Sequence, residues 1–255
     1  MKAMILAAGL GTRLKPLTDT RPKALVELNG RTLLEITLTR LRTFAITEVI
    51  INVHHHADMI IDYLKSKNYF GLRIEISREE VLLDTGGGLK KAAWFFLEDP
   101  KNLDEPFLLH NVDVLSTIDF AQMLQFHNDD HALATLAVQS RPTSRQLLFD
   151  NHNQLRARRM EGHSPLATRH SPLPEAPEPS PLHPLAFSGI HLLSPRLLPL
   201  LTEDGIFSII DSYLRLSSEG QKIIAFRADH FYWRDLGRPA DLTQAALDVL
   251  EKRLP

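Results

Sequence analysis

Two glycines and three cationic side chains follow the first apolar segment of the chain. Residues 4–8 form a short apolar run, Gly9 and Gly11 come next, and Arg13, Lys15 and Lys23 follow at short spacing. Glycine lets the backbone approach a ligand closely, and the exposed amide groups of such a turn bind anions. Arginine adds a planar fork of donors, and lysine adds a point charge. The pattern predicts a polyphosphate cradle, although neither the P-loop nor the dinucleotide fingerprint is complete.

Two aspartates that are far apart in the sequence each follow a segment expected to be a strand. Asp113 comes after the apolar residues 107–109, and Asp235 follows Trp233 and Arg234. A carboxylate at a strand end of an α/β sheet can face a ligand, although either residue alone would more often belong to a turn or a helix cap. Two carboxylates together with phosphate oxygens are a usual way to hold Mg²⁺. Together the two aspartates predict a magnesium site.

An acidic segment that ends in three glycines is the third candidate. Glu79 and Asp84 precede the glycines at 86–88, which open an expected helix. Successive glycines at a helix start predict bare amide groups that can receive a base or a phosphate. A carboxylate can accept from N3–H of uracil and equally from N1–H and N2–H of guanine, so the identity of the base stays open.

The sequence also resembles a known family. The run from Leu6 to Thr18, Leu-Ala-Ala-Gly-Leu-Gly-Thr-Arg-Leu-Lys-Pro-Leu-Thr, followed by Pro-Lys-Ala-Leu at 22–25, is similar to the signature of the sugar-1-phosphate nucleotidyltransferases, the NDP-sugar pyrophosphorylases. This resemblance implies that a sugar 1-phosphate oxygen attacks the α-phosphorus of a nucleoside triphosphate and pyrophosphate leaves. Residues 109–114 and 233–237 resemble the strand ending in Gly-Asp and the Trp-x-Asp-x-Gly stretch of that family, with Val112 where the family usually has Gly.

The resemblance implies roles for individual residues. The catalytic residues would be Arg13, Lys23, Asp113 and Asp235, of which the two aspartates would bind Mg²⁺. Ser188 and Gly189, in the stretch Phe-Ser-Gly-Ile, would face the sugar. The nucleotide would contact Leu6, Ala7, Ala8, Gly9, Gly11, Thr12, Arg13, Lys15, Lys23, Glu79, Asp84, Gly88 and Asn111.

Within the family, the Thr-Gly-Gly-Gly form at 85–88, the compact length and residues 185–190 resemble most the uridylyltransferases that use UTP and N-acetylmuramate 1-phosphate in cell-wall recycling. One alternative is a GTP-dependent guanylyltransferase for mannose 1-phosphate or a heptose phosphate. Another is a non-catalytic regulatory subunit that binds nucleotide or sugar phosphate, but such relatives usually lose the cradle cations or the metal carboxylates. The base and the sugar therefore stay open.

The elements that must position these residues alternate along the chain. Strands are expected at 4–8, 49–53, 72–77, 107–110 and 133–139, with helices at 32–44, 57–67 and 120–128 and another after the glycine turn at 86–88. This alternation predicts an α/β fold with a doubly wound, mainly parallel mixed sheet of Rossmann-like type. A hairpin at 147–158 and later strands predict a small β-rich, sugar-binding part.

One nucleotidyltransferase domain is expected over residues 1–255. Seven prolines within residues 161–184 predict an extended, mobile insertion that forms no helix or central strand. It is either a plain surface insertion, which we favour, or a lid over the sugar site.

Composition limits the partners. The chain has 255 residues, 44% of them hydrophobic, without a long apolar run, an export signal or cysteine. Its 29 basic and 31 acidic side chains show no basic block. We therefore expect a cytoplasmic protein with small-molecule substrates and neither a nucleic-acid nor a membrane partner, and the sequence leaves the oligomeric state open.

Overall fold

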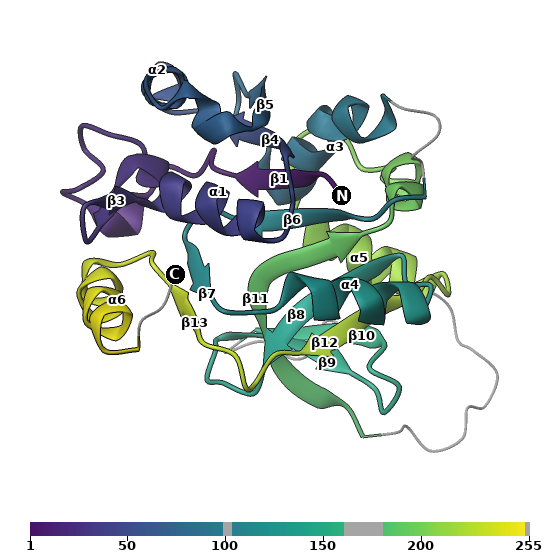
Figure 1. The fold of residues 1–255 in the computed structure, drawn as a ribbon. Coiled ribbons are helices and arrows are strands. Elements are labelled where there is room, and N and C mark those ends of the chain that lie inside the picture. Colours follow the sequence, from purple (N-terminus) through teal and green to yellow (C-terminus); the bar gives the residue numbers. More distant parts are fainter. Residues whose placement is uncertain (99–103, 161–180, 253–255) are drawn as a thin grey trace.

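Parallel strands joined by helices build the first half of the molecule. The computed structural model describes residues 1–98, 104–160 and 181–252 (Figure 1). Strands β5, β4, β1 and β6 lie side by side in that order and run parallel. The elements of this half are β1 Ala3–Leu6, β2 Glu27–Leu28, β3 Arg31–Thr32, α1 Leu33–Thr43, β4 Glu48–Val53, α2 Ala57–Ser66, β5 Arg73–Arg78, α3 Asp84–Leu97 and β6 Phe107–Asn111.

The second half of the chain extends the same sheet with mixed pairing. Strand β11 runs antiparallel to β6 and also pairs with β8 and β9, while β12 runs parallel to β8. Strands β7 and β13 form a separate antiparallel ribbon (Figure 1). The elements are β7 Val114–Ser116, α4 Phe120–Asp129, β8 Ala134–Gln139, β9 Arg145–Phe149, β10 Leu155–Met160, β11 His183–Leu193, α5 Ile209–Ser218, β12 Ile223–Arg227, β13 Trp233–Asp235 and α6 Pro239–Lys252.

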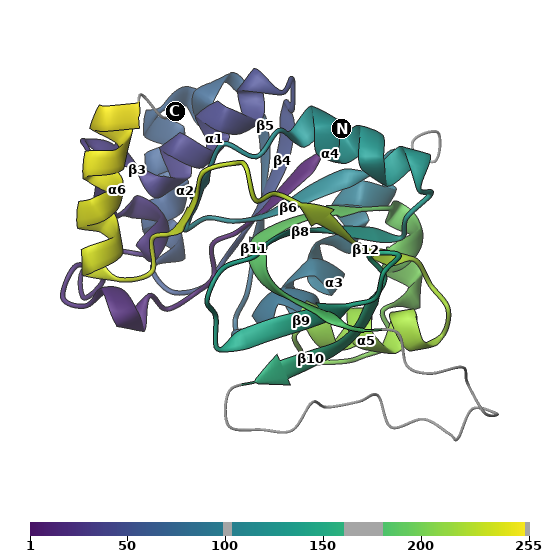
Figure 2. The same ribbon diagram turned by 90° about the horizontal axis from the view of Figure 1, so that it is seen from below.

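Helices cover both faces of the sheet, as Figure 2 shows, with α1, α2 and α4 on one side and α3 and α5 on the other. Residues of β1 alternate between the two apolar cores, since Ala3 and Ile5 pack in one and Met4 in the other. Three helices begin at capping side chains, Thr32, Asp119 and Ser208, which accept hydrogen bonds from amides of the first turn. The predicted α/β architecture with a mainly parallel mixed sheet is confirmed.

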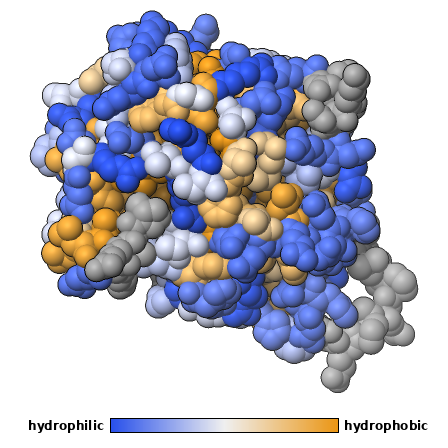
Figure 3. All heavy atoms as spheres, viewed as in Figure 1, coloured by the Kyte–Doolittle hydropathy of each residue, from blue (hydrophilic) through white to orange (hydrophobic). Residues whose placement is uncertain are grey.

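A third apolar cluster ties the C-terminal helix to the beginning of the chain. Leu242 and Ala245 of α6 pack in it together with Leu14, Leu115 and Leu236. On the outer side of the same helix, Leu247 and Leu250 are exposed, and apolar surface gathers over α6 in the view of Figure 3. The cluster therefore holds the segment after the first strand next to the segment that follows β13.

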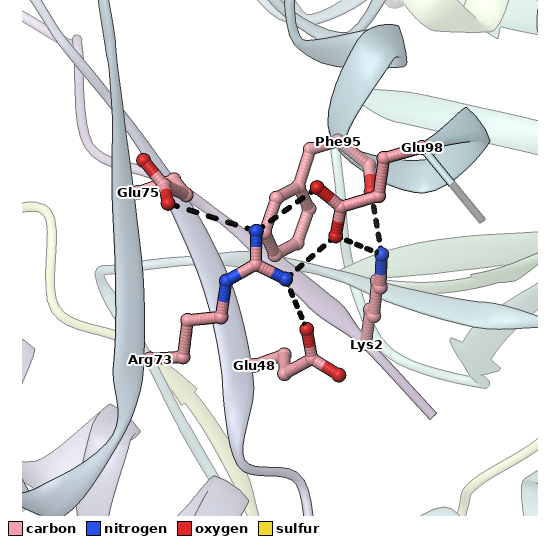
Figure 4. Close-up of polar contacts among 6 residues, drawn as sticks. All are labelled: Lys2, Glu48, Arg73, Glu75, Phe95 and Glu98. Carbon is pink, nitrogen blue, oxygen red and sulfur yellow. Dashed lines mark hydrogen bonds and ion pairs between the residues drawn. The ribbon is translucent and has the colours of Figure 1, made fainter.

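An ion-pair network fastens the edge of the sheet where β1, β4 and β5 begin. The guanidinium of Arg73 bonds Glu48 at 2.5 Å and Glu98 at 2.6 and 2.9 Å, and Lys2 bonds Glu98 at 2.6 Å (Figure 4). Glu75 lies 3.7 Å from Arg73. This network joins the last turn of α3 to three strands at the edge opposite the glycine-rich turn.

One sequence expectation needs correction here. The proline-rich insertion predicted at 161–184 lies outside the described residues as far as residue 180, but His183 and Pro184 belong to strand β11. Pro184 fits because β11 pairs only with β9 at this point among the described strands, so one side of the strand needs no N–H donor.

Within the described part of the chain, each helix is too short or too polar to cross a membrane.

Candidate active site

The glycine-rich turn leaves β1 at the carboxyl edge of the parallel strands. Gly11 has a φ of +65°, and a Cβ there would lie 2.9 Å from Cγ2 of Thr18, whose hydroxyl donates to the Gly11 carbonyl. A glycine is therefore required at 11 for both its conformation and its packing. A Cβ at Gly9 would meet no atom within 4 Å, so Gly9 is the open part of the turn.

The three predicted cations lie in different surroundings. The Lys23 side chain is 12% exposed and contacts the carboxylate of Asp113. Arg13 is 55% exposed, and its Nη2 lies 3.8 Å from Oδ2 of Asp235. Lys15 is 64% exposed and lies 3.5 Å from Asp19. The structure thus brings two of the three cations to the two predicted carboxylates and leaves Lys15 at the surface.

The backbones of the two aspartates come together through the ribbon of β7 and β13. Asp235 pairs in register with Val114, the residue after Asp113, and the amide of Leu236 donates to the Asp113 carbonyl at 2.8 Å. The Asp235 carboxylate accepts from the amide of Gly237 at 2.6 Å. The backbones of two residues that are 122 positions apart in the numbering therefore lie next to each other.

The two aspartates suit a hard cation such as Mg²⁺. Their oxygens are the ligand type that Mg²⁺ prefers, and this ion needs few protein ligands because it retains water and binds phosphate oxygens. In the part of the chain that the structure describes, no group of three His, Cys, Asp or Glu side chains is arranged to hold a metal ion. A metal at this place would therefore depend on substrate oxygens, and the magnesium site stays a prediction.

A cavity of about 360 Å³ opens beside the turn. Among the predicted nucleotide-binding and catalytic residues, its wall includes Leu6, Ala7, Ala8, Gly9, Lys23, Glu79, Asp84, Asn111 and Asp113. Gly11, Thr12, Arg13, Lys15, Gly88 and Asp235 are not part of this wall. The structure thus collects residues from the first segment, the acidic segment and the end of β6 around one hollow.

Two of the three glycines, Gly86 and Gly87, do not present bare amides, so the expectation is wrong for them. The amides of Gly86 and Gly87 both point at the carbonyl of Phe207, at 3.0 and 3.4 Å. A Cβ on Gly86 would lie 2.3 Å from the Phe207 ring, and one on Gly87 would lie 2.4 Å from the carbonyl oxygen of Gly205. Positions 86 and 87 need glycine because a distant segment, residues 205–207, packs on the first turn of α3.

The two acidic residues of this segment differ in accessibility. Glu79 is buried, and its carboxylate accepts from Asn52 at 2.7 Å and from the amide of Leu83 at 2.9 Å. Asp84 is exposed and has a φ of +59°. Both residues line the cavity, and their role in reading a base stays a prediction, with Asp84 the more accessible of the two.

The residues predicted to face a sugar lie on β11. Ser188 is fully buried, and its hydroxyl has no hydrogen-bond partner among the described residues. The indole N–H of Trp233 donates to the Ser188 carbonyl at 2.7 Å. Gly189 has a φ of +71°, and a Cβ there would lie 2.7 Å from Nδ2 of Asn111. Contact of the Ser188 hydroxyl with a sugar would therefore require its neighbours to move.

His110, on β6 beneath the site, is almost completely buried and bonds through Nδ1 to the carbonyl of Asn111 at 2.8 Å. Burial lowers the pKa of His110 to about 4. This histidine is therefore neutral at neutral pH and has no access to a ligand in the cavity.

The cavity wall includes five residues that were not among the predicted site residues: Asn52, Leu82, Thr85, Val112 and Ile206. Asn52 accepts from the amide of Ala7 at 2.8 Å and so links the first strand to Glu79. The sequence contains a signal for Asn52, because it is the one polar residue in the apolar run 49–53. Ile206, 65% exposed at the cavity, comes from the distant segment on the glycines and has no local signal.

Comparison with known proteins gives consistent matches. Residues 2–157 match the family model described as nucleotidyl transferase. The chain is 30% identical to N-acetylmuramate alpha-1-phosphate uridylyltransferase of Caulobacter vibrioides, over 93% of this chain and 92% of that protein. It is 27% identical to probable mannose-1-phosphate guanylyltransferase 1 of Oryza sativa subsp. japonica, over 100% of this chain and 67% of that one. The fold is similar to HddC from Yersinia pseudotuberculosis, crystallised with GMP-PN, with a TM-score of 0.73 and 22% identity over 97% and 98% of the two chains.

Proposed function

Because this chain belongs to the nucleotidyl transferase family, and within it to the sugar-1-phosphate nucleotidyltransferases, we propose that it converts UTP and N-acetylmuramate 1-phosphate into UDP-N-acetylmuramate and pyrophosphate. The observation that carries this proposal is the cavity whose wall combines Gly9, Lys23 and Asp113 at the carboxyl edge of the sheet. In open α/β sheets, ligands bind at this edge. We take residues 1–255 as one domain for this activity.

The reaction is a single in-line displacement. The phosphate oxygen of the sugar attacks the α-phosphorus, the bond from the α-phosphorus to the bridging oxygen breaks, and pyrophosphate leaves. Arg13, with Lys15, neutralises the phosphates that become pyrophosphate. Lys23 lies against the α-phosphate and the incoming sugar phosphate. Catalysis is then positioning and charge stabilisation, as in other phosphoryl-type transfers.

The nucleophile needs no general base. A sugar phosphate has a second pKa of about 6 and is largely a dianion at neutral pH. The described site agrees with this, since His110 is buried and neutral beneath it. The residues of this chain therefore need to hold two anions together and do not need to remove a proton.

Asp113 and Asp235 would hold the metal ion. When bound, Mg²⁺ would supply positive charge that offsets the negative charge of the phosphates. Before ligands arrive, Lys23 and Arg13 form ion pairs with these carboxylates. The phosphates of a nucleotide would offer both cations a new partner, which would leave the carboxylates free to act as ligands.

The choice of UTP and the muramate rests on the relative from Caulobacter vibrioides, whose length this chain matches almost completely. A GTP-dependent enzyme that acts on mannose 1-phosphate is the second candidate, because the rice relative carries that name at 27% identity. A regulatory subunit without activity is a third possibility, and it is disfavoured because Arg13, Lys23, Asp113 and Asp235 are all present.

Pyrophosphate release with Mg²⁺ tests the proposal. UTP and GTP are each combined with N-acetylmuramate 1-phosphate and with mannose 1-phosphate, and a coupled phosphate assay follows release. Fast release with UTP and the muramate alone is the expected result. Preference for GTP and mannose 1-phosphate would overturn the substrate choice and retain the reaction. Absence of release with all four pairs, by a protein that binds nucleotide, would favour the regulatory subunit.

A further inference from the structure

Arg141 follows β8 at the edge of the sheet where Asp113 lies. Strands β8 and β6 are both antiparallel to β11, so their carboxyl ends reach the same edge. The guanidinium of Arg141 lies 3.6 Å from the centre of the Trp233 ring, and its Nη2 donates to the carbonyl of Phe187 at 2.6 Å. Arg141 therefore contacts both β13, which carries Asp235, and the stretch of β11 that precedes Ser188.

Unsatisfied polar atoms gather around the same tryptophan. Nε of Arg141 and the hydroxyls of Ser188 and Ser116 are buried, and none of the three has a hydrogen-bond partner among the described residues. Ser116 is the cross-strand partner of Trp233, and Ser188 accepts the indole N–H through its carbonyl. Buried polar atoms are normally paired, so three unpaired ones on residues that adjoin Trp233 leave hydrogen-bonding capacity for a ligand or for water, which would reach the Ser188 hydroxyl only after its neighbours move.

The charge of Arg141 is only partly compensated. Burial lowers its pKa and the charge of Asp235 raises it, yet Arg141 forms no ion pair with a carboxylate of the described residues. Asp235 itself has Arg13 at 3.8 Å. A half-buried cation without its own counter-ion is costly unless an anion binds it. Its planar fork suits a carboxylate or a phosphate.

The nucleotide phosphates already have Arg13, Lys15 and Lys23 on the cradle side. Arg141 is not part of the wall of the cavity that Lys23 lines, and it lies beside Trp233 and the β11 stretch. We propose that Arg141 binds an anionic group of the acceptor sugar phosphate and so sets which acceptors the enzyme uses. This inference rests on the proposed function. The anion is either the 1-phosphate or a carboxylate on the sugar, and the experiment below separates the two.

A purely structural role for Arg141 needs its own control. Arg227 bonds the hydroxyl of Ser140 at 2.9 Å and the carboxylate of Asp229 at 2.8 Å, and Asp229 in turn accepts from the amide of Ser140 at 2.6 Å. Arg227→Gln therefore loosens the turn that carries Arg141, but it retains the Arg141 side chain itself. Arg141→Lys retains the charge and removes the planar fork.

The experiment compares Arg141→Gln, Arg141→Lys and Arg227→Gln with the unchanged protein. KM is measured for the acceptor at saturating UTP and for UTP at saturating acceptor. N-acetylmuramate 1-phosphate is compared with N-acetylglucosamine 1-phosphate, which lacks the lactyl carboxylate. Calorimetric titration with each acceptor, with and without a non-hydrolysable UTP analogue, measures binding without turnover, and thermal melting reports folding.

We expect Arg141→Gln to raise the acceptor KM and Kd by about ten- to a hundredfold, as loss of a charged hydrogen bond does. The KM for UTP and the melting temperature should stay close to those of the unchanged protein. The acceptor KM and Kd of Arg141→Lys should lie between those of Arg141→Gln and those of the unchanged protein. An effect on both acceptors identifies the 1-phosphate as the anion. An effect on the muramate alone identifies the carboxylate.

Two outcomes would overturn the inference. One is an acceptor KM and Kd that do not change in Arg141→Gln. The other is a parallel rise of both KM values that Arg227→Gln reproduces, which would make Arg141 a brace of the turn. If the unchanged protein binds an acceptor in an Arg141-dependent manner but turns over no pair, the proposed function fails and the inference stands.

Discussion

The ammonium group of Lys23 contacts the carboxylate of Asp113, although the two residues are 90 positions apart in the sequence. Their side chains are 12% and 15% exposed, so each neutralises the other in a largely dry place at the cavity wall. Such a pair is stable only while both partners remain. A bound nucleotide would exchange it for contacts of Lys23 with phosphate and of Asp113 with a metal ion.

Asp113→Asn removes a metal ligand in this scheme and keeps the size of the side chain. We expect turnover to fall by about a thousandfold or more at any Mg²⁺ concentration, since metal and charge stabilisation contribute several kcal/mol to such reactions. Pyrophosphate release during a Mg²⁺ titration measures this, with thermal melting as a folding check. Asp130→Asn, which breaks an exposed pair with Lys222, is the control. Near-normal activity of Asp113→Asn would exclude Asp113 from the metal site.

Arg13 and Lys15 should differ in importance. Arg13 lies near Asp235 and packs against Gly237, whereas Lys15 lies at the surface beside Asp19. We expect Arg13→Gln to lower kcat/KM for UTP by about ten- to a hundredfold and Lys15→Gln by only a fewfold, because charged hydrogen bonds made at close range carry more energy. Initial rates at varied UTP decide this. Equal losses would show that the turn rearranges when nucleotide binds.

The polyphosphate cradle stays a prediction, and the information on which it depends is local. The glycines and cations between residues 9 and 23 lie within one short stretch, and the structure places Gly9 and Lys23 on one cavity wall. The meeting of Asp113 and Asp235 depends on β7, which is too short for a periodic signal. The glycines of α3 were misread because their packing partner, residues 205–207, lies more than a hundred positions away. The same distance effect hid Arg141, whose neighbours come from β11 and β13.

An added methyl group should lower stability at Gly87 and weaken UTP binding at Gly9. A Cβ on Gly87 would lie 2.4 Å from a backbone oxygen, so Gly87→Ala should lower the free energy of unfolding by about 1–3 kcal/mol. A Cβ on Gly9 meets no atom within 4 Å but lines the cavity, so Gly9→Ala should fold normally. We expect its KM for UTP to rise by about tenfold or more, equivalent to about 1.4 kcal/mol. Urea denaturation and initial rates of both variants test this, and a destabilised Gly9→Ala would contradict it.

Glu98 should make stability depend on acid pH. Hydrogen bonds from Arg73, and then from Lys2, lower the pKa of Glu98 to about 2 from its ordinary value of 4.5. The folded protein therefore binds this proton less readily than the unfolded chain does. The stabilisation is complete above about pH 4.5 and is lost as the pH falls toward about 2. Because the Glu98 and Arg73 side chains are 29% and 45% exposed, solvent screening limits it to about 1 kcal/mol.

The variant Glu98→Gln tests this dependence. We expect its free energy of unfolding to lie about 1 kcal/mol below that of the unchanged protein at pH 7, and the difference to shrink as the pH falls from 4.5 toward 2. Urea denaturation at pH 7, 4 and 3 measures it, since urea adds no screening ions. Glu75→Gln, which removes a single 3.7 Å contact with Arg73, should change little at any of these pH values. A difference that persists undiminished in acid would mean that Glu98 stabilises the fold through packing and not through its charge.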